Sequence, residues 1–142
     1  MHLSSLIYTA AYITLASGEC FGSGQKWDGD KDAVISFVTQ KCNANFNADG
    51  FKGPWEKKGN GTPYRSGRLE LSNGRYARLA MFRIGNGGTD AAGYMDPADC
   101  IDWFKKEINR CEHGGRSQYT NWEYKADINK KGTNDDDTIN WW

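Results

Sequence analysis

Four cysteines constrain this chain more than any other feature of its sequence. An even number of cysteines in a short chain with a predicted signal peptide, described below, predicts disulfides rather than free thiols. The sequence contains no C-x-x-C pair, the spacing that would indicate a zinc site. We therefore expect a small fold stapled by two disulfides, with no metal site and no cofactor. The cysteines concerned are Cys20, Cys42, Cys100 and Cys111.

The last two cysteines lie in one predicted helix, and the geometry of that helix limits their pairing. The eleven steps from Cys100 to Cys111 separate the two Cα atoms by roughly 16 Å at the rise of an α-helix, whereas a disulfide needs about 7 Å or less. They therefore cannot bond to each other, and each must reach Cys20 or Cys42. Two pairings stay open, and either one holds the helix at both ends.

The first eighteen residues are typical of a secretory signal peptide. Residues 1–18 contain no Asp, Glu, Lys or Arg, run apolar from Leu6 to Ala16 and end in small residues. No later run approaches the roughly 20 apolar residues that a membrane span needs. We expect residues 19–142 to form one secreted, extracellular domain without a membrane span, in which residues 133–142 are a loose tail.

The charge of the chain disfavours nucleic acid as a partner. Its formal net charge is +0, although residues 52–83 are rich in Lys and Arg and residues 90–142 are rich in Asp and Glu. Binding to phosphates needs a concentrated cationic face, which a neutral chain does not favour. We therefore expect no nucleic acid among the partners.

Local signals predict two helices. Asp96 can cap the later one, Pro97 takes the favoured first helical position, and Gly114-Gly115 ends it. An Asp of the stretch 28–32 caps the earlier helix, although the β-branched run AVISFV leaves a buried strand as the alternative. If this earlier segment is helical, its apolar face consists of Val34, Val38 and Cys42.

A β-hairpin and a later strand complete the predicted elements. Asn73-Gly74 stands between the runs 68–71 and 75–82, and this dipeptide is a strong hairpin signal. Residues 120–128 alternate between apolar and polar side chains, as a half-buried strand does. Residues 43–63 are expected to be mostly irregular, with Asn60 as a glycosylation candidate in a surface loop. The order of elements indicates an α+β fold, a single-domain α/β sandwich with helices packed on an antiparallel sheet.

His113 is the one histidine that follows the predicted signal peptide. The structural interpretation is that it caps the end of the later helix. The catalytic interpretation makes it a general base beside Glu112 or Glu123, as in a secreted ribonuclease. Arg78 or Arg83 would then hold the phosphate. Nothing in the sequence brings these residues together, and neither a nucleophile elbow nor a metal motif is present, so we expect no catalytic residue and no enzyme activity.

Aromatic side chains are better candidates for function. The chain holds six Trp and seven Tyr, and the faces of these rings pack on sugar rings while their polar edges hydrogen-bond. Trp122 is a candidate ligand-binding residue, although its alternation with polar neighbours favours a place in the core. Four others, in predicted loops or on a polar face, are freer to meet a ligand: Tyr119, Trp55, Tyr64 and Trp27.

Several short motifs carry a family resemblance. The stretch Cys20-Phe21-Gly22-Ser23-Gly24, the run Glu107-Ile108-x-x-Cys111-x-x-Gly114-Gly115 and the aromatic strand that ends in Ala126-Asp127 form a recurring pattern. In these motifs the chain resembles the small secreted fungal glycan-binding proteins first described as mushroom lectins. The resemblance covers both ends of the chain after the predicted signal peptide and leaves residues 43–98 largely unmatched. A second, looser resemblance is to fungal killer toxins of similar size.

The lectin resemblance implies an extracellular α/β sandwich that binds carbohydrate without catalysis and that serves in some relatives as a candidate effector in host interaction. The chain departs from the pattern at Asp127-Ile128-Asn129 and Gly132-Thr133-Asn134, where relatives tend to have Asp-Pro-Asn and a final cysteine. Glycans are thus the expected partner. The alternatives are a toxin or effector that acts on a host protein or a membrane target through basic residues such as Arg65, Arg68 and Arg75, and, third, a ribonuclease.

Overall fold

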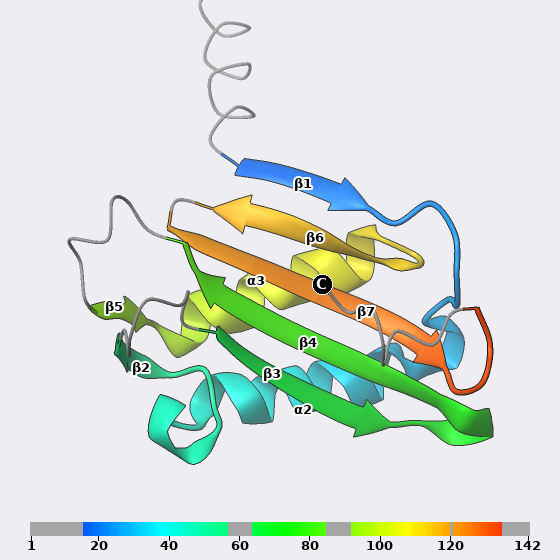
Figure 1. The fold of residues 1–142 in the computed structure, drawn as a ribbon, viewed down its shortest axis with the longest axis horizontal. Helices are drawn as coiled ribbons and strands as arrows, with labels where there is room; N and C mark the ends of the chain where they lie inside the picture. The colour runs from blue at the N-terminus through cyan, green and yellow to red at the C-terminus, as the bar shows by residue number, and fades with distance from the viewer. Residues whose placement is uncertain (1–15, 57–63, 85–91, 120, 135–142) are drawn as a thin grey trace, which may run out of the picture.

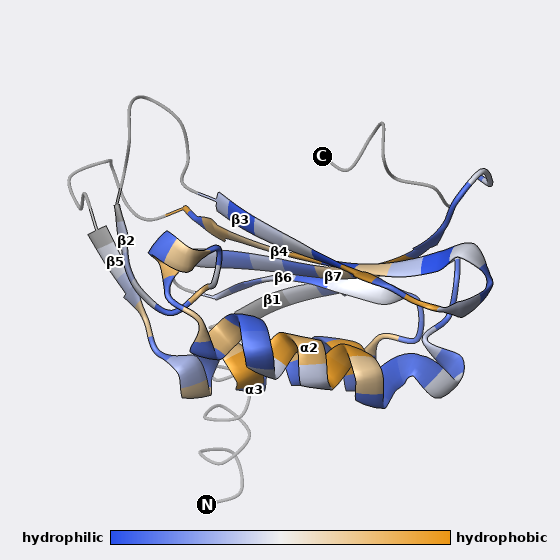
Figure 2. Ribbon diagram, turned by 90° about the horizontal axis from the view of Figure 1, so that it is seen from below, coloured by the Kyte–Doolittle hydropathy of each residue, from blue (hydrophilic) through white to orange (hydrophobic). Residues whose placement is uncertain are grey.

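The computed structural model describes residues 16–56, 64–84, 92–119 and 121–134. Within these residues, two helices pack on one face of an antiparallel sheet, so the predicted α+β class is confirmed (Figures 1 and 2). Most of the predicted signal peptide, the Asn60 sequon and the predicted tail beyond Asn134 lie outside the described residues. In the described part of the chain, no helix is long and apolar enough to cross a membrane.

The elements follow one another in an order that interleaves short strands with the two helices. Single turns of 3-10 helix, η1, η2 and η3, cover Asp28–Asp30, Phe46–Ala48 and Ser72–Gly74. The main elements are β1 (Ala16–Cys20), α2 (Lys31–Asn43), β2 (Gly53–Glu56), β3 (Tyr64–Glu70), β4 (Arg75–Arg83), β5 (Ala92–Met95), α3 (Pro97–Arg110), β6 (Gly114–Tyr119) and β7 (Trp122–Lys130).

The main sheet has the strand order β1-β6-β7-β4-β3, and every neighbouring pair is antiparallel. The predicted hairpin is confirmed as β3 and β4, in which Glu70 lies opposite Tyr76. Asn73 and Gly74 both have positive φ, 61° and 72°, at the turn. These two residue types adopt such angles most easily, which explains why the Asn-Gly signal located the turn correctly. β2 and β5 pair separately, at one end of the sandwich.

The core lies between the helices and the inner face of the sheet (Figure 2). The apolar face predicted for the first helix is confirmed, because Val34, Val38 and Cys42 of α2 are buried. In β4 and β7, alternate residues point to the same inner face, and Leu79 lies directly opposite Ala126. The inward side chains of these two strands are Ala77, Leu79, Met81, Trp122, Tyr124, Ala126 and Ile128.

The two disulfides connect α3 to two segments that lie far before it in the chain. Cys42 of α2 bonds to Cys100 in the first turn of α3, and Cys20 at the end of β1 bonds to Cys111 just after α3. The Cα atoms lie 5.7 and 5.1 Å apart, respectively. The structure therefore selects one of the two pairings left open by the sequence and confirms that both ends of α3 are bridged. Two disulfides are compatible with an extracellular protein.

The cap of α3 is confirmed, whereas the cap predicted for α2 is wrong in its detail. The Asp96 carboxylate accepts a hydrogen bond from Ala98 N–H at 2.7 Å, with Pro97 in the first turn. Asp30 occupies the N-cap position of α2 but makes no capping hydrogen bond. Its carboxylate instead pairs with the Arg75 guanidinium at 2.6 Å, which ties the start of α2 to the start of β4.

Four strands lack a counterpart in the sequence-based prediction: β1, β2, β5 and β6. α3 ends at Arg110, and the glycines predicted to stop it begin β6 instead. Gly114 has φ +83°, and a Cβ on Gly115 would lie 2.2 Å from a carboxylate oxygen of Glu107. Close packing of β6 on α3 therefore requires these glycines. β1 includes Ala16 to Gly18, the last residues of the predicted signal peptide.

Candidate functional site

The outer face of the main sheet, opposite the helices, carries most of the sheet's charge. Strand alternation places charged side chains from neighbouring strands directly across from one another, such as Arg78 opposite Asp127. Arg116 of β6 donates to the Glu123 carboxylate of β7 at 2.7 Å. The residues that alternation assigns to this outer face in the three central strands are Tyr76, Arg78, Ala80, Phe82, Arg116, Gln118, Glu123, Lys125, Asp127 and Asn129.

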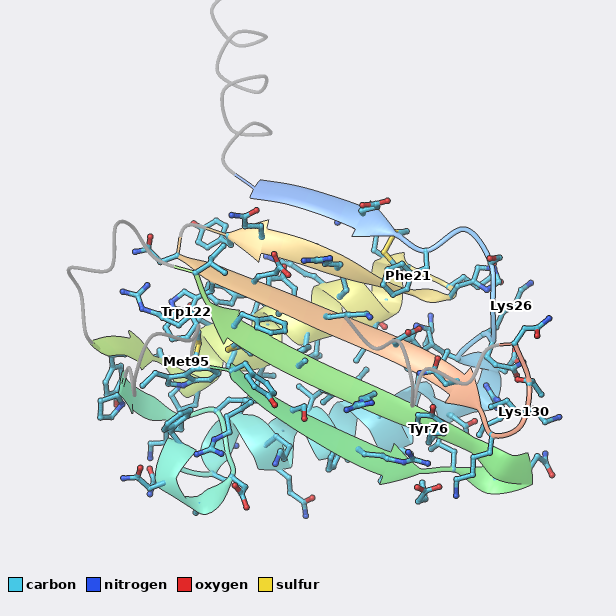
Figure 3. The ribbon with its side chains drawn as sticks, viewed as in Figure 1. Phe21, Lys26, Tyr76, Met95, Trp122 and Lys130 are labelled. Atoms are coloured by element: carbon cyan, nitrogen blue, oxygen red, sulfur yellow. A yellow bond between two sulfur atoms is a disulfide. The ribbon has the colours of Figure 1, made fainter. Side chains whose placement is uncertain are left out.

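A hollow of ≈ 400 Å³ lies on this face between β7 and the segment that follows β1. Its rim on one side is the stretch Glu19 to Gly24, and Phe21 projects from that stretch (Figure 3). Its floor and far side come from β7, through Lys125, Asp127 and Asn129. The hollow thus joins one aromatic ring to a cation, a carboxylate and an amide. We call it the outer-face hollow below.

The rim segment is held in place by the turn that follows α3. Cys20 is bonded to Cys111, and Phe21 N–H donates to Gly114 C=O at 2.9 Å. The ring N–H of Trp27 donates to Cys111 C=O at 2.8 Å. Because a disulfide and several hydrogen bonds fix both ends of the segment, Phe21 is positioned by the scaffold.

His113 belongs to this support and does not cap the helix as predicted. Its Nδ1 lies 2.9 Å from the Gly24 carbonyl oxygen, whereas the end of α3 is closed by the Cys111 N–H bond to Glu107 C=O. The prediction fails because α3 ends before the turn that carries His113. The imidazole therefore fastens the rim of the outer-face hollow.

Asn129 is the most unusual group in the hollow. It is 4% exposed, and its Nδ2 has no hydrogen-bond partner among the described residues. A buried donor without a partner costs roughly 1–3 kcal/mol, so such a group is well suited to an acceptor supplied from outside the protein. Beside it, the Asp127 carboxylate accepts from Ile128 N–H at 2.9 Å, and Lys125 Nζ lies 5.5 Å from the centre of the Phe21 ring.

The aromatic residues predicted to bind a ligand do not form one site. Trp27 and Trp55 are 0% exposed, so the prediction that these two are free to meet a ligand is wrong. Both indole N–H groups donate to backbone carbonyls, which explains how such large amphipathic rings are buried at low cost. Trp122 is buried as well, in agreement with the alternation in β7.

Tyr64 and Tyr119 are exposed, but they lie on different strands and different faces of the sheet. Tyr64 of β3 is 55% exposed and stacks on Phe82, on the outer face. Tyr119 of β6 is 38% exposed and packs against Trp103 of α3, on the inner side. Sequence reasoning did not single out Phe21 as a binding residue, because its position beside β7 depends on the Cys20–Cys111 bridge, which no local pattern predicts.

The residues named in the ribonuclease hypothesis interact with different partners and not with one another. His113 contacts the Gly24 carbonyl, Glu112 forms an ion pair with Lys26 at 3.3 Å, and Glu123 bonds to Arg116. Arg78 lies opposite Asp127 in the sheet. The described contacts therefore do not assemble a base beside a phosphate clamp.

The basic residues of the toxin hypothesis are also paired. Arg65 lies 3.3 Å from the Asp49 carboxylate, and Arg68 lies 2.7 Å from that of Glu70. Arg75 bonds to Asp30, as described above. Ion pairs of this kind reduce the positive potential that the sequence alone suggests for this stretch.

Glu107 is a buried carboxyl group between α3 and β6, away from the outer-face hollow. It is 1% exposed and accepts a hydrogen bond from Ser117 Oγ at 2.6 Å. Burial raises the pKa of Glu107, and the Ser117 hydrogen bond and the Arg110 charge oppose this shift. Burial also raises the pKa of the neighbouring Tyr124 phenol. Because Glu107 and Ser117 are both buried and bonded to each other, we assign this network to the scaffold.

Among the described residues, no group of three or more His, Cys, Asp or Glu side chains is arranged to hold a metal ion. Comparison with known proteins adds no family. No protein-family model matches the chain, and no curated protein matches it. The proposal below therefore rests on the geometry of the outer-face hollow.

Proposed function

We propose that this protein is a secreted carbohydrate-binding protein that binds glycan in the outer-face hollow without catalysis, in the role of a lectin or a host-interaction effector. The observation that carries the proposal is the buried Asn129 amide, which lacks a hydrogen-bond partner among the described residues and lines a hollow beside an aromatic ring. A sugar offers both counterparts, because its hydroxyl oxygens accept hydrogen bonds and its C–H face packs on aromatic rings.

The other groups of the hollow support the same ligand class. Asp127 and Glu19 offer carboxylate acceptors for sugar hydroxyls, and Lys125 offers a donor. The volume of ≈ 400 Å³ falls within the range of small-molecule sites. The hollow is open and polar, which favours a hydroxyl-rich ligand over an apolar one.

A glycan array probed with the purified, disulfide-bonded protein tests the proposal. We expect selective binding to a subset of glycans, and we expect Phe21→Ala to weaken it by about tenfold, or about 1.4 kcal/mol. Tyr94→Ala is the matched control, because Tyr94 is a 65% exposed aromatic residue on β5, outside the hollow. Silence of the folded protein across the array, or equal loss in the two variants, would overturn the proposal.

A further inference from the structure

The two disulfides differ in their exposure to solvent. Cys42 and Cys100 are 0% exposed and belong to the core between the helices and the sheet. Cys20, by contrast, is exposed at the end of the edge strand β1, whereas its partner Cys111 is 1% exposed. Thiol–disulfide exchange requires that a thiolate reach one of the two bonded sulfur atoms. Of the four cysteines, Cys20 therefore offers the accessible sulfur.

The scaffold carboxyl group Glu107 lies beside the buried sulfur of the exposed bridge. Glu107 Oε1 is 3.8 Å from Cys111 Sγ, and Glu107 Oε2 accepts from Ser117 Oγ at 2.6 Å. Gly115 packs against both groups, because a Cβ on this glycine would lie 2.2 Å from Glu107 Oε1 and 3.0 Å from Cys111 Sγ. One carboxyl oxygen is thus held by the serine, and the other is next to the sulfur.

We propose that the Cys20–Cys111 disulfide is a thiol-exchange site, at which a small external thiol attacks Cys20 and Glu107 assists the departure of Cys111. Opening of this bridge loosens the rim of the outer-face hollow and lowers its affinity for glycan. The exchange stands independently of the proposed function, whereas its effect on glycan binding rests on it.

The exchange proceeds in two displacements. The external thiolate bonds to Cys20 Sγ, and the bond between Cys20 and Cys111 breaks with its electron pair on Cys111. The neutral Glu107 carboxyl group gives its proton to this thiolate and regains one from water. A second external thiolate then attacks the external sulfur of the mixed disulfide and releases Cys20. The protein disulfide thus gains two electrons and two protons, and two external thiols are oxidised to one disulfide.

Burial explains why the departure of Cys111 needs assistance. A thiolate in apolar surroundings is costly, so a buried cysteine is a poor leaving group. Burial also raises the pKa of Glu107, which keeps a proton close to the sulfur. Once ionised, the same carboxylate would repel the departing thiolate.

The ionisable side chains that interact with Glu107 leave this role to the carboxyl group itself. Arg110 of α3 opposes the rise in the Glu107 pKa through its charge, and Ser117 of β6 opposes it through its hydrogen bond. Burial raises the pKa of the Tyr124 phenol of β7, so this phenol stays neutral over the range in which a carboxyl group titrates.

The bridge also holds one end of the rim of the outer-face hollow. It lies at the end of β1, directly before Phe21 (Figure 3). When the bridge opens, the hydrogen bond from Phe21 N–H to Gly114 C=O remains, but it constrains the segment less than a covalent link does. The far end stays attached through His113 and Trp27, so the loosening is concentrated at Phe21.

Alkylation of the thiols that appear in the folded protein tests the exchange. The protein is incubated with reduced glutathione, quenched with iodoacetamide at increasing times and analysed by peptide mass spectrometry. We expect Cys20 and Cys111 to be released at least about tenfold faster than Cys42 and Cys100, which are the internal control. The glutathione adduct should be on Cys20. Equal rates for the two bridges, or an adduct mainly on Cys111, would overturn the exchange site.

The pH profile of the exchange rate tests the part of Glu107. Division of the rate by the concentration of glutathione thiolate removes the ionisation of the reagent. The corrected rate should fall by about tenfold as pH rises through the pKa of Glu107, because the neutral carboxyl group is the proton donor. Glu107→Gln does not titrate, so its corrected rate should stay constant. The same fall in the variant, or no fall in the unmodified protein, would overturn the assistance by Glu107.

Glycan affinity tests the effect on the hollow separately. If the loosened rim holds the binding geometry one-tenth of the time, affinity falls by about tenfold. We expect this loss in Cys20→Ser/Cys111→Ser and also in unmodified protein whose Cys20 and Cys111 have been selectively reduced and alkylated. Unchanged affinity in both samples would overturn the effect and leave the exchange. If the exchange is selective and no form of the protein binds glycan, the exchange stands and the proposed function fails.

Discussion

The two faces of the main sheet are built from the same strands but differ in burial and polarity. In β4, Leu79 points to the inner face and is part of the core, whereas Arg78 beside it lies on the outer face. In β7, Ala126 and Asn129 are divided in the same way. The inner face is apolar and stapled by disulfides, while the outer face carries charges, a hollow and an amide without a partner among the described residues. Stability thus depends on the inward residues and the proposed binding on the outward ones, so changes on the two faces should have separable effects.

The largest expected effect is on the disulfide beneath the inner face. Cys42→Ala/Cys100→Ala removes the bridge between α2 and α3, whose cysteines are 58 residues apart. Loss of the constraint on the unfolded chain should lower the free energy of unfolding by about 4 kcal/mol. Urea unfolding of the oxidised proteins measures the change. A loss below about 1 kcal/mol would show that the helices hold together without this bridge.

The next effect compares two adjacent residues on opposite faces of β4. Leu79→Ala should lower the free energy of unfolding by about 3 kcal/mol, because Leu79 is wholly buried and its removal leaves a cavity. Arg78→Ala should cost about 1 kcal/mol or less. Urea unfolding under identical conditions gives both values. Equal losses of unfolding free energy would contradict the prediction that the inner face contributes more to stability than the outer face.

A smaller effect should separate binding from stability on the outer face. Asn129→Ala removes a buried amide whose Nδ2 has no partner among the described residues, so it should change the free energy of unfolding by about 1 kcal/mol or less. The same change should weaken glycan binding by about tenfold, as titration calorimetry would measure. If stability falls by several kcal/mol instead, Asn129 is structural and the hollow loses its central group.

The smallest effect concerns the pH dependence of stability on the inner face. Burial raises the pKa of Glu107, so the folded protein holds the neutral carboxyl group more tightly than the unfolded chain does. The favourable contribution is complete below the ordinary pKa and disappears as pH rises through the raised one. Glu107→Gln stays neutral and can still accept from Ser117. It should therefore gain stability relative to the unmodified protein as pH rises from below about 4 to about 7.

Unfolding curves of the two proteins at several pH values check this prediction. The difference between the proteins isolates Glu107, because the other carboxyl groups contribute equally to both. A difference that stays constant with pH would mean that Glu107 is ionised in the fold at no cost.

Sequence periodicity and turn chemistry determined the elements that form by local rules. The Asn73-Gly74 turn, the Asp96 cap and the alternation of β7 each depend on a few neighbouring residues, and all three are confirmed. The spacing of Cys100 and Cys111 excluded their mutual bond for a purely geometric reason. The fold class followed, because an amphipathic helix and a half-buried strand must each cover the other's apolar face.

The tertiary structure alone decided which distant groups meet. β1, β2 and β5 are short strands that pair with segments far away in sequence, so no local pattern marks them. β6 forms a tight hairpin with β7, in which Tyr119 lies opposite Trp122, but its first residues, Gly114 and Gly115, were interpreted as the end of the helix. Tryptophan is a residue type that is common in binding sites, which is why Trp27 and Trp55 were predicted to meet a ligand. Both are buried instead, because a backbone carbonyl accepts a hydrogen bond from each indole N–H. Phe21 and Asn129 line the same outer-face hollow because β1, the Cys20–Cys111 bridge and the β6–β7 pairing place their segments side by side. Local chemistry determined the helices, the hairpin and β7, whereas long-range pairing determined the site, because the proximity of residues about a hundred positions apart depends on the packing of the whole chain.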